Sequence, residues 1–302
     1  MKHNLRIIFI LLAMFLVAQF IGLYVVNHYS TSEKGLPYGM EPPKIEKETD
    51  FYTIFPSLIL AFVIAISLLI FLSKFKAEFF LKLWFFVVII IALGIALNVP
   101  LSFSKYSSLI AFLIALPLAW EKIYRGNLLV HNTTELLVYP GIAAVFVPIL
   151  NLWTIIVLLI LISIYDMWAV WHSGIMQKMA KYQIQKLKVF SGFFVPYASK
   201  KVREKIKNMK KTLSKKQLEK KKIKVNIAIL GGGDVIFPII TAGVVLRIFG
   251  LIPALFVTAG ATLGLAYLFF FAEKRKFYPA MPFISAGIFA GMILYWLITN
   301  FL

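Results

Sequence analysis

The chain has 302 residues, of which 61% are hydrophobic and only 15% are charged, and its mean hydropathy is +0.86. Because soluble globular chains are about half apolar and about a quarter charged, this composition excludes an ordinary soluble domain and indicates a polytopic membrane protein. The chain has no cysteine, which excludes disulfides, thiolate catalysis and Cys-ligated zinc or iron–sulfur sites.

Nine apolar segments are candidates for crossing the membrane. A spanning helix needs roughly 20 mostly apolar residues, and an open strand cannot satisfy its backbone groups in lipid. We therefore expect an all-α protein with nine transmembrane helices, at residues 5–27, 51–73, 80–99, 106–120, 133–150, 152–173, 225–247, 249–272 and 277–301. The first is expected to be retained, because its apolar run is longer than that of a secretory signal and no small-x-small cleavage site follows it.

The loops differ in Lys and Arg, which gather on the cytoplasmic side of membrane proteins. The N-terminus carries Lys2 and Arg6, and residues 272–277 read AEKRKF, whereas residues 28–50 carry five acidic residues against three lysines. The alternation predicts a cytoplasmic N-terminus and, after nine spans, a C-terminus outside. We expect an integral protein of the cell (plasma) membrane.

Three parts are predicted: six helices in residues 1–173, a cytoplasmic loop at 174–224, and three helices in residues 225–302. The loop carries 17 of the 32 basic residues. Its apolar residues at helical spacing suit either a helix on an anionic lipid surface or a solvated basic loop; they are Val202, Ile206, Met209 and Leu213. Nucleic-acid binding is not expected, because no stacking aromatics interleave with the lysines of 199–224.

Within this loop, the segment VFSGFFVPYA at 189–198 is too short to span the membrane. It either dips into the membrane, acts as a plug or packs on the surface, and the sequence leaves these alternatives open.

Only two of the 13 acidic residues, Asp166 and Asp234, lie well inside a predicted span. An acid near the bilayer centre is costly and is a functional candidate, whereas a structural contact would more usually use Asn, Ser or Thr. Asp166 lies about seven or eight residues before the cytoplasmic end of its span. Asp234 lies about nine residues after the cytoplasmic end of its own span. Both are therefore expected on the order of 10–14 Å below the cytoplasmic surface of the membrane. Because the two spans are consecutive and antiparallel, the carboxyls can face each other.

Two facing carboxyls in a low-dielectric site cannot both ionise cheaply, so the pair shares one proton. Such a pair is suited to hydrolysis: one oxygen takes a proton from water while the protonated partner polarises the scissile carbonyl. No metal or cofactor is expected, and the sequence has neither HExxH nor GxSxG.

Three glycines precede Asp234 in the segment ILGGGDVIF, residues 229–237. Gly231, Gly232 and Gly233 weaken a helix by about 1 kcal/mol each relative to Ala, and they let another backbone approach closely. A substrate helix must unwind to be cleaved, and its freed backbone groups then need partners within the lipid. Ordinary close helix packing is the alternative explanation.

These residues resemble the GxGD intramembrane aspartyl proteases, the family of presenilin and signal peptide peptidase. The matching motifs are the pair YD (Tyr165 and Asp166), the run GGGD (Gly231 to Asp234) and the stretch YPAMPF, in which Met281 stands where the family usually has Leu. The resemblance implies that Asp166 and Asp234 are the catalytic dyad and that Tyr165 lies beside it. It implies that Gly231 and Gly233 match the fixed glycines and Gly232 the variable position.

The resemblance also implies that Pro279, Ala280 and Met281 border the active site and help to receive substrate. The basic loop favours the presenilin-like orientation, and the short remaining loops resemble the single-chain microbial (archaeal-type) presenilin homologues. The expected partners are therefore single-span membrane proteins or peptides as substrates and the lipid bilayer, without obligatory accessory subunits.

Two other functions remain open from the residues alone. A proton- or cation-coupled transporter or channel would also use buried aspartates. It does not explain the PAMP sequence at residues 279–282, and we find no internal repeat of the kind common in transporters. A non-catalytic scaffold or chaperone for membrane helices is the other alternative. The pairs Gly260/Gly264 and Gly287/Gly291 predict tight packing of the last two helices or, alternatively, oligomerisation.

Overall fold

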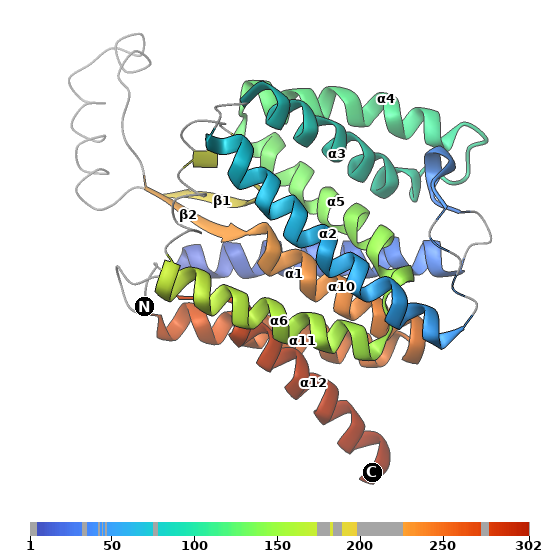
Figure 1. The fold of residues 1–302 in the computed structure, drawn as a ribbon, viewed down its shortest axis with the longest axis vertical. Coiled ribbons are helices and arrows are strands. Elements are labelled where there is room, and N and C mark those ends of the chain that lie inside the picture. The colour runs from blue at the N-terminus through green and yellow to red at the C-terminus, as the bar shows by residue number, and fades with distance from the viewer. Residues whose placement is uncertain are drawn as a thin grey trace.

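Long apolar helices and one small sheet make up the described part of the chain in the computed structural model (Figure 1). The structure describes residues 5–31, 35–41, 43, 45, 47–74, 78–173, 182–183, 189–197, 226–272 and 278–301. Its long helices are α1 (Leu5–Thr31), α2 (Glu48–Lys74), α3 (Glu78–Asn98), α4 (Ser107–Trp120), α5 (Leu128–Phe146), α6 (Leu152–Trp168), α10 (Gly232–Phe249), α11 (Leu251–Phe271) and α12 (Met281–Phe301). Within these ranges nine helices are long and apolar enough to cross a membrane, as predicted.

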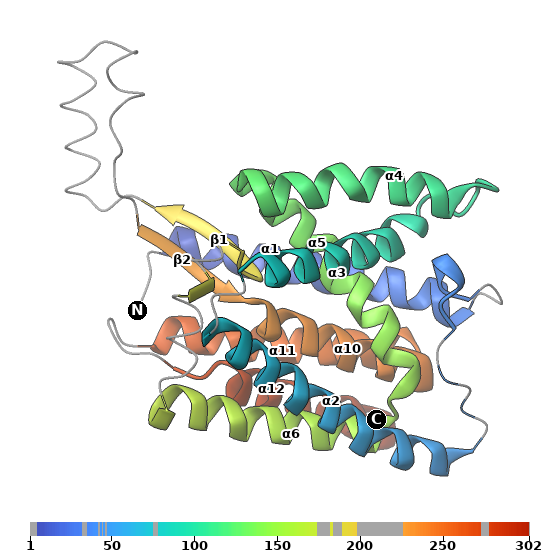
Figure 2. The same cartoon turned by 45° about the horizontal axis from the view of Figure 1, so that its top comes forward.

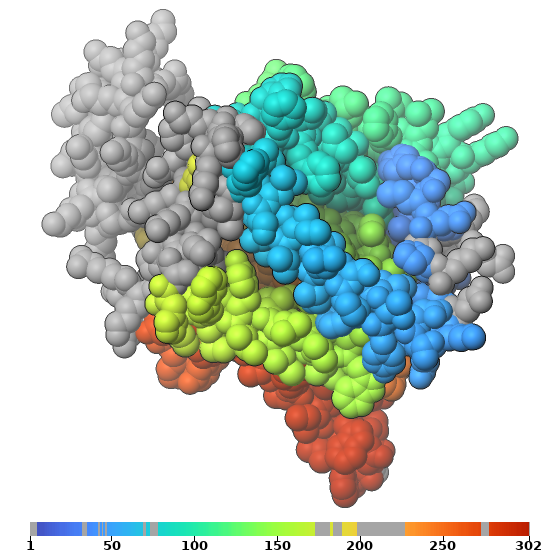
Figure 3. Space-filling model, in the orientation of Figure 1, coloured from blue at the N-terminus to red at the C-terminus, as the bar shows by residue number. Residues whose placement is uncertain are grey.

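Helix α10 is the most enclosed of the spans, with 61% of its residues buried. It packs against α1, α5 and α11, and Figure 2 shows it between α3 and α4 on one side and α6 and α12 on the other. Phe15, Tyr139 and Ile239 join the core from three different helices. Helix α2, in contrast, lies across the surface of the face seen in Figure 3. The helix that carries Asp234 is thus fixed by packing on several sides.

The ends of several helices follow from local residues. The Asn127 side chain accepts a hydrogen bond from the backbone N–H of Leu129 and caps α5. Asn151 and Thr154 form a capping box at the start of α6, just after the short 3-10 turn that contains Pro148. These residues confirm the predicted boundary between the fifth and sixth spans. Single π-helical turns extend α4 over Glu121–Arg125 and α6 over Ala169–Ser173.

The prediction of an all-α fold with a helix over 225–247 is wrong at its N-terminal side. Strand β2 (Asn226–Gly231) precedes α10 and pairs antiparallel with strand β1 (Gly192–Tyr197), in a register that sets Gly192 opposite Gly231. β1 falls within the segment 189–198, so that segment forms a strand. The strand is compatible with the membrane because its partner satisfies backbone groups that would otherwise be unpaired.

Side chains of the sheet alternate between a buried and an exposed face. Ala228 and Leu230 of β2 are buried, whereas Ile227 and Ile229 are exposed. Phe193 of β1 is fully buried and lies edge-on against Tyr139 of α5. One face of the hairpin therefore belongs to the core, and the period of two identifies these residues as strand.

The glycines of the last two helices pack against each other within one chain. A Cβ added at Gly260 would overlap the backbone carbonyl oxygen of Gly287, and one at Gly287 would overlap that of Gly260. Gly264 and Gly291 contact the backbone of the opposite helix in the same way. This confirms the predicted tight packing of α11 against α12.

Most of the predicted cytoplasmic loop 174–224 lies outside the described residues, which include only 182–183 and 189–197 of it. The stretch from Val202 to Leu213, for which a surface helix and a solvated loop are the alternatives, lies outside the described residues.

Candidate active site

Asp166 lies in the last turn of α6 and is 4% exposed. Its Oδ2 accepts a hydrogen bond of 3.0 Å from the backbone N–H of Met281, the first residue of α12. The first N–H groups of a helix have no partner within that helix, and they favour a carboxylate. A second contact joins the same helices, because Ser163 Oγ lies 3.0 Å from Ser285 Oγ. The start of α12 thus holds the carboxyl of Asp166.

Asp234 lies in the first turn of α10, directly after β2. The expectation that it lies about nine residues inside a helix is therefore wrong, because the strand replaces the first part of the expected span. The Asp234 carboxyl accepts a hydrogen bond from the backbone of Gly231 and lies close enough to Asp166 to interact with it electrostatically. The two carboxyls thus lie within electrostatic range of each other, one near the end of α6 and the other near the start of α10.

The three glycines before Asp234 occupy different surroundings. Gly232 is buried, and a Cβ added there would lie 2.5 Å from Ser191 Oγ and 3.0 Å from Tyr139 OH. At Gly231 a Cβ would lie 3.1 Å from Asp234 Oδ2, whereas at Gly233 the nearest atom, on the ring of Phe237, is 3.8 Å away. Gly232, the position that the resemblance treats as variable, therefore has the least room for a side chain in this chain.

The remaining predicted residues differ in exposure. Tyr165 is 44% exposed, and its ring lies 6.4 Å from that of Trp168. Pro279 is buried just before α12, Ala280 is half-buried, and the Met281 side chain is buried. The Pro279–Ala280–Met281 stretch thus lies beside Asp166, and Tyr165 points to a more open surface.

Sequence reasoning missed a set of polar residues around the hairpin. It counted Glu135 as lying near a span end, yet Glu135 is 1% exposed and its Oε1 lies 2.6 Å from Nζ of Lys122. It also missed Gln19 of α1, whose Nε2 donates a 3.1 Å hydrogen bond to the carbonyl of Val235, next to Asp234. The sequence could have indicated this ion pair, because Lys122 and Glu135 lie at adjacent ends of two consecutive antiparallel spans.

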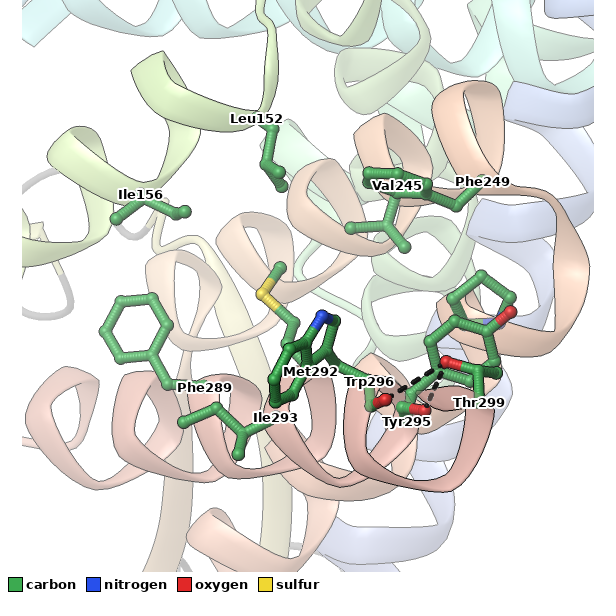
Figure 4. A pocket seen from close by; sticks show the side chains of 11 residues that line it. Leu152, Ile156, Val245, Phe249, Phe289, Met292, Ile293, Tyr295, Trp296 and Thr299 are labelled. Atoms are coloured by element: carbon green, nitrogen blue, oxygen red, sulfur yellow. Dashed lines mark hydrogen bonds between the residues drawn. The ribbon is translucent and has the colours of Figure 1, made fainter. Parts of the chain in front are cut away.

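A cavity of about 570 Å³ lies between the helices that carry the two aspartates and the last two helices (Figure 4). Its lining is apolar except for Thr299 and the hydroxyl and indole groups of two aromatic residues; it comprises Leu152, Ile156, Val245, Phe249, Pro253, Phe289, Met292, Ile293, Tyr295, Trp296 and Thr299. Because Val245 and Phe249 belong to the end of α10 opposite Asp234, the cavity lies away from Asp234 along this helix. No three His, Asp or Glu side chains in the described ranges gather as a metal site requires.

Comparison with known proteins relates this arrangement to a family. The family model described as signal-peptide peptidase, presenilin aspartyl protease matches residues 12–301. A solved structure of a presenilin family intramembrane aspartate protease in space group C222 is similar, with a TM-score of 0.60 and 18% identity over 96% of this chain and 99% of that one. Its P2 crystal form gives a TM-score of 0.59 and 18% identity over 95% and 96% of the two chains. No curated protein matches the chain.

The fold of these structures agrees with the nine-helix architecture, and the family model covers nearly the whole chain, including both aspartates, the glycine run and the start of α12. The chain therefore belongs to the signal peptide peptidase and presenilin family, and it is an intramembrane-cleaving aspartic endopeptidase.

Proposed function

We propose that Asp166 and Asp234 form the dyad that hydrolyses peptide bonds within single-span membrane proteins. The observation that supports this proposal is that the two carboxyls lie near enough to interact electrostatically, one accepting from Met281 N–H and the other from the backbone of Gly231. One carboxylate takes a proton from water as the water attacks the scissile carbonyl carbon. The other carboxyl donates its proton to the carbonyl oxygen, and the tetrahedral intermediate collapses when a proton passes to the leaving amine.

The open edge of β2 provides a place for an unwound substrate. Gly192 and Phe194 of β1 direct their N–H and C=O groups to α5. In an antiparallel ladder their partners Gly231 and Ile229 then direct their own groups away from β1. In the described part of the chain no third strand takes these groups, and the backbone of Gly231 donates to the Asp234 carboxyl instead. A substrate strand bound there satisfies its freed backbone groups and lies next to Asp234.

We propose that the apolar cavity receives side chains from the part of the substrate that remains in the membrane. Helices α6 and α10 line it and also carry the aspartates, which supports a substrate path that includes both the cavity and the two aspartates. We further propose a cytoplasmic N-terminus, an outside C-terminus, location in the plasma membrane and activity without accessory subunits. The distribution of basic residues supports the orientation, and it also supports contact of the loop 174–224 with anionic lipid.

The test uses the purified full chain in proteoliposomes with a single-span peptide substrate. Asp166→Asn and Asp234→Asn should each abolish cleavage, because Asn neither activates water nor donates a carboxylic proton. An unchanged melting temperature would show that both variants fold. A transition-state analogue of aspartyl proteases should inhibit the unmodified chain, and cleavage by either folded Asn variant would rule out the dyad.

A further inference from the structure

The edge of β1 that faces away from β2 is covered by polar side chains of α5. Asn132 donates from Nδ2 to the carbonyl of Phe194 at 2.8 Å, and its Oδ1 accepts from the N–H of Phe194 at 3.0 Å. His131 Nε2 lies 2.8 Å from the carbonyl oxygen of Gly192, and Glu135 Oε1 lies 3.4 Å from the nitrogen of Gly192. One helix thus binds both backbone groups of Gly192 and of Phe194, as a third strand would.

A buried ion pair fixes the geometry of this edge. Lys122 Nζ lies 2.6 Å from Glu135 Oε1, and the two side chains are 3% and 1% exposed. His131 Nε2 is also within 3.7 Å of the same oxygen. Removing two charges from water is costly. Apolar side chains of similar volume would often stabilise a fold as much as the ion pair does. The pair is therefore better explained by the precise placement of Glu135 than by stability.

The hairpin connects this cluster to the catalytic region. Gly192 stands opposite Gly231 in the sheet, and the N–H of Gly232 donates to the carbonyl of Ser191 at 3.2 Å. α10 begins at Gly232, and Asp234 lies in its first turn. Because a two-stranded hairpin is marginally stable alone, contacts outside the sheet must hold its register. The α5 side chains supply such contacts on the side remote from the substrate edge.

We propose that His131, Asn132 and Glu135 are positioning residues that fix β1 and thereby set the register of β2 and the place of Asp234. The proposal rests on the proposed function, since register matters only if this site cleaves a substrate. A displacement of about 1 Å can lower a catalytic rate about 10²-fold. A shift in strand register also presents different substrate backbone groups to the dyad.

The decisive variant is Asn132→Leu, which removes both hydrogen bonds to Phe194 at similar side-chain volume. Measured in proteoliposomes with a single-span peptide, kcat per folded enzyme should fall at least tenfold. Mass spectrometry of the products should show added cleavage positions one or two residues from the original one. A purely structural role would lower the amount of folded enzyme without moving the cleavage position.

Two further variants complete the test. Asn98→Leu is the matched control, since Asn98 donates to Tyr29 OH and accepts from Ser108 Oγ in a region away from the hairpin. It should leave kcat per folded enzyme and the cleavage position unchanged. Asn132→Asp keeps the acceptor for the N–H of Phe194 but loses the donor to its carbonyl. It should give a smaller fall in kcat with the same added products, and it replaces the Leu variant if that protein does not fold.

The outcomes separate the positioning role from the proposed function. If the Asn132 variants fold and cleave at the original position with unchanged kcat, the positioning role is wrong. It is also wrong if Asn98→Leu moves the cleavage position as much as the Asn132 variants do. If the unmodified chain does not cleave, or if Asp234→Asn still cleaves, the proposed function itself fails.

Discussion

The backbone N–H of Met281 donates a 3.0 Å hydrogen bond to Oδ2 of Asp166, so the start of α12 contacts this carboxyl through its main chain. The N–H groups of the first helical turn have no intrahelical acceptor, and a carboxylate satisfies one of them here. The resemblance raised the question of whether Met in place of Leu alters this region. Because the hydrogen bond comes from the backbone, the side chain at this position contributes only packing.

Met281→Pro should lower kcat/KM by about 10- to 100-fold, because Pro has no N–H and a hydrogen bond to a charged group is worth about 1.5–3 kcal/mol. Pro is well tolerated in the first turn of a helix, so α12 should persist. Steady-state cleavage of a single-span peptide, together with the helical signal in circular dichroism, measures both effects. Met281→Leu is the control and should keep nearly full activity; equal losses in the two variants would contradict a backbone role.

Gly232→Ala should destabilise the protein by about 1–3 kcal/mol, because the added methyl group crowds Ser191 Oγ and the Tyr139 ring. Ser191→Gly in the same chain should recover part of the loss in thermal denaturation, since it removes the nearest atom. If the Gly232→Ala variant is as stable as the unmodified chain, the hairpin shifts to make room for the methyl group and the crowding has no effect on stability.

Gly233→Ala should be at least as stable as the unmodified chain, because the site has room for a methyl group and Ala favours a helix by about 1 kcal/mol. Its cleavage rate should nevertheless fall, since the methyl group lies beside Asp234 where a substrate backbone must approach. Melting temperature and kcat/KM, measured on one preparation, separate these effects. Full activity with raised stability would mean that the substrate does not approach Gly233.

Ile229→Pro tests the open edge of β2. The N–H of Ile229 points away from β1, so its loss should weaken substrate binding while the ladder with β1 persists. We expect a rise in KM for a single-span peptide with little change in melting temperature. Ile229→Val keeps the N–H and is the control. Leu230→Pro removes an N–H that points towards β1 and should lower stability. An unchanged KM in Ile229→Pro would show that the substrate does not bind at this edge.

Arg247 should be a main determinant of stability at the end of α10 remote from Asp234. Its guanidinium donates to the carbonyls of Pro148 and Leu150, and it lies over the Phe51 ring at 5.7 Å. Arg247→Met should lower the free energy of unfolding by about 2–4 kcal/mol, because it leaves buried carbonyls unpaired. Chemical denaturation in detergent measures the loss.

Arg125→Met is the matched control, since Arg125 forms an exposed pair with Glu121 at 3.1 Å. An exposed pair contributes about 0–1 kcal/mol, so this variant should change stability little. Equal losses in the free energy of unfolding for Arg247→Met and Arg125→Met would show that the contacts of Arg247 with the two carbonyls do not stabilise the fold.

Much of the helical fold could be predicted because length and hydropathy determine which segments can span a bilayer. The expected boundary between the spans 133–150 and 152–173 is confirmed by the capping box at Asn151. The sheet was missed because a short apolar run such as residues 226–231 has the same hydropathy as the start of a helix. The residues of β1 that pair with β2 lie 29 to 39 positions earlier in the chain, and hydropathy contains no information about such a pairing.

The two aspartates could be found because each is an ionisable group in an apolar segment, which is rare without a function. Glu135 escaped notice because its position near a predicted span end made it look exposed. Its burial depends on Lys122 from another helix and on the hairpin, and only the tertiary structure brings these together. The tight environment of Gly232 depends in the same way on Ser191 and Tyr139.

The strand before α10 also bears on biogenesis. Since the helix begins at Gly232, Asp234 enters the bilayer in the first turn of a helix, where a carboxylate is favoured, and not in the middle of a continuous apolar helix. The energetic barrier to integrating this segment during synthesis is correspondingly lower.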